Sequence, residues 1–304
     1  MDKRICLTGI LNHCYQRPQD KGVLFYTVSD HLVFFTIFCI CASQYKVRVL
    51  KLVQMPDHIH HATIELRTGE LSRFASTYGA LFSRVYNEHV GRKGQLFEHP
   101  FQSVPKRGDK KARTNLLYLD NNPVERHLVQ QAEDYQWNYL AYGNSDHPFS
   151  EKRILRKASM PLRRALARVK NQHATGRYMP YELLQTLFRS LPDDRERCQL
   201  TDYIITTYSI IDHQAAIRFF DTYEAELIAA HASTGSEYDL NEVFVGKSDK
   251  YYAQMSSVIR QTGRYPDIHQ ILTLPTEEKK ELFQLLRRET MAPGQQIAAF
   301  LHLQ

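Results

Sequence analysis

The 304-residue sequence predicts an α+β protein with a mixed first half and a mainly helical second half. Two segments near residue 50 alternate apolar and polar side chains as strands do, and residues 70–90 repeat apolar side chains at the helical period. After residue 150 the alternation fades and the helical period dominates. The chain is long enough for two domains, so we expect one over residues 1–150 and an α-helical one over residues 151–304.

The first elements along the chain are a helix and a hairpin. Ser29-Asp30 is a suitable cap for a helix that runs to about Tyr45. Residues 46–55 and 58–66 read as two strands, and Pro56-Asp57 between them marks the turn.

A long helix and a basic loop follow. The apolar period predicts a helix over residues 70–90, a loop over 91–94 and a strand region over 95–104. The next helix carries Tyr118, and Asn121-Asn122-Pro123 should stop it because proline cannot continue a helix. The loop expected before that helix holds five cations: Lys106, Arg107, Lys110, Lys111 and Arg113.

The second half offers fewer signals. Residues 152–170 carry a stripe of Lys and Arg. It suits either a DNA contact, in addition to the basic loop at 106–113, or a linker helix. Two short helices, 277–288 and 295–303, resemble a helix-turn-helix over residues 265–304 whose second helix could enter a major groove. That second helix has few base-reading side chains beyond Gln295, Gln296 and His302, so a hairpin packed against the rest of the chain is an equal alternative.

Composition narrows the class of protein. The net charge of +6 and the pI near 8.9 fit a phosphate-bearing partner without requiring one. The five cysteines form no CxxC pair, which argues against a disulfide framework or a cysteine zinc site and favours a reducing cytoplasm. No signal peptide is evident, and the most apolar segment, residues 32–42, is too short to cross a bilayer. We therefore expect no membrane partner.

His58-Ile59-His60 is the first candidate for chemistry. Side chains alternate along a strand, so both imidazoles should project from one face and could share a divalent metal, while Ile59 enters the core. Two satisfied surface histidines are the alternative.

Tyr118 and Asn122 form the second candidate. A tyrosine hydroxyl becomes a useful nucleophile beside a phosphate that a metal polarises. Asn122 lies four residues on, hence on the same helical face, and its amide oxygen could be a third metal ligand. The alternative is a core tyrosine followed by an asparagine that caps the helix before Pro123.

Several landmarks, in one order, resemble the REP-associated tyrosine transposases, which are single-tyrosine transposases of the HUH endonuclease type. The resemblance covers roughly residues 10–143, and several ordered landmarks are more specific than one motif. The matching segments are QMPDHIH at 54–60 (family MPNHVH), LSRF at 71–74, GQLF at 94–97 with FQS at 101–103 (GxLW…RFKS), LYLDNNPV at 117–124 (RYIxxNPVRAGLV) and DYQWNY at 134–139 (DYPWSSY).

The resemblance implies a ferredoxin-like HUH domain that cuts and rejoins single-stranded, hairpin-forming DNA. His58 and His60 would bind Mg²⁺ or Mn²⁺ with Asn122, and Tyr118 would form a 5′-phosphotyrosine and free a 3′-hydroxyl. It also implies a homodimer that works at the nucleoid in a bacterial cytoplasm.

The basic residues and two departures from the family pattern concern DNA. Lys106, Arg107, Lys110, Lys111, Arg113 and Arg126 are the expected DNA contacts, although a solvated basic loop is equally compatible with the charge. Asp57 stands where the family has Asn, which would add negative charge near the metal, and Glu125 stands where it has Arg.

Three functions compete. The first is the transposase, and the second is a catalytically inactive, domesticated DNA-binding protein of the same fold. The third is a hydrolase in which metal on His58 and His60 activates water. Tyr118 and Asn122 lie in the matching block and no extra carboxylate cluster is evident, which favours the first.

Overall fold

A four-stranded antiparallel sheet forms the centre of the first half. The structure, a computed structural model, describes residues 5–99, 101–233 and 248–303. The sheet has the strand order β2-β3-β1-β4, and chain order gives the β-α-β-β-α-β sequence of ferredoxin-like folds. Its elements are β1 (Leu11–Gln16), α1 (Val28–Ala42), β2 (Val47–Met55), β3 (His58–Glu65), α2 (Glu70–Val90) and β4 (Gln102–Lys106). The expected α+β architecture is confirmed.

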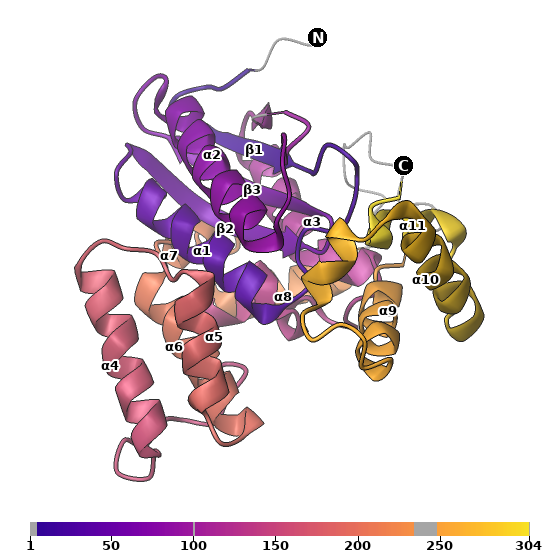
Figure 1. Cartoon of the computed structure of the whole chain (residues 1–304). Helices are drawn as coiled ribbons and strands as arrows, with labels where there is room; N and C mark the ends of the chain where they lie inside the picture. The colour runs from indigo at the N-terminus through magenta and orange to yellow at the C-terminus, as the bar shows by residue number, and fades with distance from the viewer. Residues whose placement is uncertain (1–4, 100, 234–247, 304) are drawn as a thin grey trace.

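Different helices cover the two faces of the sheet. The helices α1 and α2 share one apolar cluster with Cys14 and Ile59 (Figure 1). The next helix, α3 (Asp109–Glu125), belongs to a second cluster with Leu11 and Ala62. Side chains of α3 therefore meet the face of β1 and β3 opposite to the one that α1 and α2 cover.

The start of α1 differs from the sequence prediction in its capping residue. Thr27 is the N-cap, its hydroxyl accepts from the Asp30 amide, and the Asp30 carboxylate accepts from the Thr27 amide. This reciprocal pair is a capping box, so Asp30 acts from inside the helix. The helix ends at Ala42, before the predicted Tyr45, and its apolar segment lies buried in the core.

The central hairpin is confirmed, whereas the flanking strands differ from prediction. Met55 pairs with His58 across the turn, and the register of β2 on β3 shifts between Val49 and Lys51. β1 was not predicted. Only residues 102–104 of the predicted 95–104 region lie in β4, which continues to Lys106.

Two predictions around Tyr118 were wrong. The helix α3 begins at Asp109, so Lys110, Lys111 and Arg113 lie in its first turns rather than in a loop. It also continues through Pro123 to Glu125. Pro123 lies in the last turn of α3. Proline has no backbone N–H, so the helix loses one hydrogen bond there, but it ends soon afterwards and can tolerate the loss.

The remaining elements are helical, and they pack back onto the first half. The helices α4 to α6 share the core of α1, whereas α9 to α11 form a separate cluster with Val23 and Tyr26 (Figure 1). Packing thus crosses residue 150 in three places, because Ala216 and Ala230 also join the cluster of α3. The elements are η1 (Ala132–Asp134), η2 (Gln136–Asn138), η3 (Leu140–Gly143), α4 (Met160–Ala174), α5 (Tyr181–Ser190), α6 (Asp194–Tyr208), α7 (His213–Ile217), α8 (Tyr223–Ala232), α9 (Lys250–Gln261), η4 (Ile268–Thr273), α10 (Thr276–Glu289) and α11 (Gly294–Leu301).

The predicted recognition helix, α11, packs against its own chain. Gln296 is buried and donates to the Ser248 carbonyl at 2.9 Å, and His302 bonds Asp20 at 2.6 Å. Of the three base-reading candidates, Gln295 alone is exposed. This packing favours the alternative of a hairpin docked on the chain.

In the three described stretches, each helix is too short or too polar to pass through a bilayer.

Candidate metal and nucleophile site

Strand β3 places two histidines side by side. The ring centroids of His58 and His60 are 4.8 Å apart, with their planes at 84°. Ile59 between them is fully buried in the cluster of α1 and α2. His61 also faces that side, where its Nε2 lies 3.1 Å from the Tyr78 hydroxyl. The alternation expected from the sequence is therefore present, and His61 is separated from the pair.

Strand β1 adds a third histidine that sequence reasoning missed. Nε2 of His13 lies 3.0 Å from Nδ1 of His60, and both side chains are buried. The ring of Tyr15, two residues on, lies 4.9 Å from the His60 ring. His13 and Tyr15 are two residues apart, which was a signal for a strand with both rings on one face. Their neighbours Asn12 and Cys14 made the segment unlike a half-exposed strand.

The helix α3 brings Tyr118 and Asn122 to these histidines. The Tyr118 ring lies 5.6 Å from the His60 ring and 5.7 Å from the His13 ring, centroid to centroid. The Asn122 amide nitrogen lies 3.0 Å from the Tyr118 hydroxyl oxygen, to which it donates, and 3.5 Å from Nε2 of His60. Residues four apart share a helical face, which explains why both reach the sheet together.

Partners hold one ring nitrogen of both His58 and His60. Histidines that bind metals usually have the other ring nitrogen held by a partner. Here Nδ1 of His58 lies 2.6 Å from the Asp57 carboxylate, and His13 holds Nδ1 of His60. Nε2 is then the nitrogen of each ring that could bind a cation.

Asn122 can supply an oxygen to the same set. Its Oδ1 is buried without a hydrogen-bond partner among the described residues. A half-turn of the amide exchanges its oxygen and nitrogen and would direct Oδ1 toward Nε2 of His60. Two imidazoles and an amide oxygen thus fit a divalent cation.

Burial keeps the central imidazoles neutral. Desolvation, followed by the charge of Lys106, lowers the pKa of His13 to about 3. Desolvation, followed by nearby His58, holds the pKa of His60 well below its usual range. Neutral imidazole is the form that binds metals.

Ion pairs continue from Asp57, the partner of His58. Arg126 bonds Asp57 at 3.2 Å and Asp249 at 2.7 Å, and the Asp249 amide donates to the Arg126 carbonyl at 2.8 Å. Arg126 is therefore a buried partner of two carboxylates, which corrects its expected place as a surface contact for DNA. Tyr118 itself is 0 % exposed.

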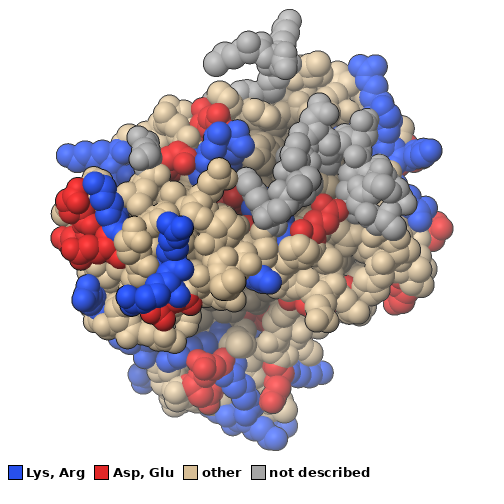
Figure 2. Space-filling view, turned by 90° about the vertical axis from the view of Figure 1, so that its right-hand side faces the viewer, with Lys and Arg blue, Asp and Glu red and all other residues tan. Residues whose placement is uncertain are grey.

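The other predicted cations lie at the opposite end of α3. Arg107, Lys110, Lys111 and Arg113 are exposed, and Lys106 is half-buried at the end of β4. The Arg113 guanidinium lies over the Phe220 ring at 5.0 Å. Lys111 precedes Tyr118 by two helical turns, or about 10 Å. On the face drawn in Figure 2, Lys and Arg are interspersed with Asp and Glu, so its described part carries no uniformly basic surface.

Comparisons with known proteins gave one structural match. No protein-family model and no curated protein matches the chain. A solved structure of the REP-associated tyrosine transposase bound to a REP hairpin aligns with 47 % of this chain and 84 % of its own, at 16 % identity and a TM-score of 0.41. The function of this chain is therefore inferred from the geometry of the site.

Proposed function

We propose that this chain is a metal-dependent DNA strand transferase, a transposase that cleaves and rejoins hairpin-forming single-stranded DNA through Tyr118. The observation that carries the proposal is the convergence of a phenol, an amide and paired imidazoles. Tyr118 meets Asn122 at 3.0 Å, and its ring lies beside those of His60 and His13. A phenol without such neighbours would be a poor nucleophile at neutral pH.

Each residue has a defined role in this proposal. His58, His60 and Asn122 would hold Mg²⁺ or Mn²⁺, which supplies charge stabilisation to the scissile phosphate. Asp57 and His13 are positioning residues because they fix the rings of His58 and His60. With its oxygen turned toward the metal, Asn122 would accept a hydrogen bond from the Tyr118 hydroxyl, which lies 3.0 Å from the same end of the amide, and would so direct the phenolic oxygen.

The reaction proceeds by exchange at phosphorus. The Tyr118 oxygen forms a bond to phosphorus as the bond to the 3′-oxygen breaks, which leaves a 5′-phosphotyrosine and a free 3′-hydroxyl. The phenol loses one proton and the 3′-oxygen gains one, so the proton count is unchanged. Attack by another 3′-hydroxyl reverses the step and rejoins DNA without ATP.

DNA has two candidate approaches to the site. The exposed cations Arg107, Lys110, Lys111 and Arg113, with Lys106, can contact phosphates. Because Tyr118 is buried, residues around it would have to move to admit a phosphate. We also expect a homodimer, which sedimentation of the purified chain would test.

One observation favours a second function. Tyr118, His60 and Asn122 are all fully buried, as expected if the fold now serves DNA binding without cleavage. That alternative is a domesticated, catalytically inactive protein.

A covalent-adduct assay separates the candidates. The full chain is incubated with end-labelled hairpin single strands and Mn²⁺ and run on a denaturing gel. We expect an adduct that disappears in Tyr118→Phe and persists in Tyr86→Phe. Tyr86 is a suitable control because its buried hydroxyl has no hydrogen-bond partner in the described part of the chain. DNA binding without an adduct would support the inactive protein, and cleavage that survives Tyr118→Phe would support the hydrolase.

A further inference from the structure

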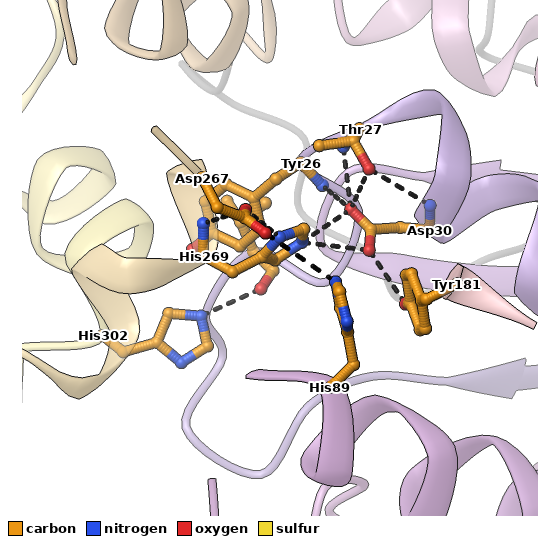
Figure 3. A network of polar contacts seen from close by, with 9 residues as sticks. Tyr26, Thr27, Asp30, His89, Tyr181, Asp267, His269 and His302 are labelled. Carbon is orange, nitrogen blue, oxygen red and sulfur yellow. Dashed lines mark hydrogen bonds and ion pairs between the residues drawn. The ribbon is translucent and has the colours of Figure 1, made fainter. Parts of the chain in front are cut away.

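A second histidine cluster lies on the other side of the sheet from Tyr118. It consists of His89 near the end of α2 and of Asp267 and His269 around the start of η4 (Figure 3). One potential ligand atom from each of the three residues lies within 4.8 Å of the other two. Segments nearly 180 residues apart in sequence thus bring two imidazoles and a carboxylate together.

The orientation of His269 is fixed by a buried carboxylate. Its Nε2 lies 3.0 Å from both oxygens of Asp30, which is itself held by the Tyr26 and Thr27 amides and the Tyr181 hydroxyl. This leaves Nδ1 of His269 facing Asp267 at 2.6 Å. A carboxylate behind a histidine is the support that metal-binding histidines commonly have.

The charges of the cluster favour a cation. Asp30 and Asp267 are two carboxylates around one imidazole, so the group keeps an excess negative charge even with His269 protonated. A divalent ion in place of the proton on Nδ1 of His269 would neutralise the group.

Ion pairing does not explain the position of the His89 ring. Its Nε2 lies 4.0 Å from the Asp267 carboxylate, beyond hydrogen-bond distance, while its ring stacks on Tyr181 at 3.7 Å. Ligand atoms around one tetrahedral zinc ion are about 3.3 Å apart, so closing the set needs shifts of about 1 Å. Asp267 is half-exposed, which gives solvent access to a fourth coordination position.

We propose that His89, Asp267 and His269 bind a zinc ion that is separate from the metal of the Tyr118 site. Nε2 of His89, Nδ1 of His269 and a carboxylate oxygen of Asp267 are the ligands. Two imidazoles and one carboxylate, with a fourth position open to solvent, are a ligand set that zinc takes in proteins. The ion joins η4 to α2 and so fastens the α9–α11 region to the sheet-bearing half.

The test compares zinc uptake by the metal-stripped full chain and by His89→Phe, measured by titration calorimetry with ZnCl₂. Phenylalanine keeps a ring against Tyr181 and removes the ligand nitrogen. The control is His231→Phe, which removes an exposed histidine that pairs with Glu133 at 3.0 Å. Any zinc that binds His58 and His60 contributes equally to all three proteins, so the difference isolates the new site.

We expect the unmodified chain and His231→Phe to bind one zinc equivalent more than His89→Phe. Zinc should also raise their thermal unfolding midpoints by more than it raises that of His89→Phe. Asp267→Asn should lose the same equivalent, and it replaces His89→Phe in the comparison if that variant does not fold. Equal uptake by all four proteins, or a loss in His231→Phe as well, would overturn the proposal.

Discussion

The amide nitrogen of Asn122 donates a hydrogen bond of 3.0 Å to the phenolic oxygen of Tyr118, one helical turn away on α3. The same amide lies 3.5 Å from Nε2 of His60 on the sheet. Asn122 therefore links the candidate nucleophile to the candidate metal ligands, and its replacement should affect both.

Asn122→Ala should weaken Mn²⁺ binding at the Tyr118 site at least tenfold, because the cation loses an oxygen ligand. Titration calorimetry with MnCl₂ measures the change. The matched control is Asn121→Ala, since the Asn121 amide points away and donates to the Ala230 carbonyl at 2.8 Å. Equal affinity in both variants would remove Asn122 from the ligand set.

Adjacent histidines on β3 should differ in what they affect. His60→Ala should abolish cleavage and Mn²⁺ binding. His61→Ala should reduce the free energy of unfolding by about 2 kcal/mol, because the Tyr78 and Thr63 hydroxyls lose a buried partner. The folded fraction of His61→Ala should still cleave DNA. Chemical denaturation gives the folded fraction, and the gel assay on the same samples gives the cleavage. Loss of cleavage in folded His61→Ala would contradict the separation of the two faces.

A buried triad holds α3 against the sheet. Lys51 bonds Asp120 at 2.7 Å and Glu226 at 2.8 Å, and all three side chains are buried. Lys51→Met should reduce the free energy of unfolding by about 3–5 kcal/mol, since two carboxylates lose their buried partner. Urea denaturation measures it, with Arg48→Met as the control, because the Arg48–Asp212 pair is partly exposed and should contribute less than about 1 kcal/mol. A similar loss in both variants would contradict this assignment.

The Asp20–His302 pair should make stability depend on acid pH. Burial raises the pKa of Asp20, but the hydrogen bond and charge of His302 outweigh it and lower the value to about 2. The stabilisation is therefore complete above the unfolded value, about 3.8, and is lost as the pH falls through about 2. Asp20→Asn should cost about 2 kcal/mol of unfolding free energy at pH 7 and progressively less below about pH 4. A cost that does not depend on pH would contradict the role of the charged pair.

The sequence predicted the parts of the site that depend on local periodicity. His58 and His60 share a face because strands alternate, and Tyr118 and Asn122 share a face because they are four residues apart. Both relationships span a few residues and are present in the structure.

The missed parts depend on long-range contacts. His13 meets His60 through pairing of strands 47 residues apart, and β1 is buried on both faces, so it lacks the alternation of a half-exposed strand. Arg126 is buried by Asp249, 123 residues away. No local pattern marks such a partner.

The most direct measurement is peptide mapping of the DNA adduct by mass spectrometry. Tryptic cleavage after Arg113 and Arg126 releases residues 114–126, in which Tyr118 is the only tyrosine. We predict a nucleotide attached to Tyr118 in this peptide when Mn²⁺ is present, and none in its absence. A nucleotide on any other residue, or cleaved DNA with peptide 114–126 unmodified throughout the reaction, would contradict Tyr118 as the nucleophile.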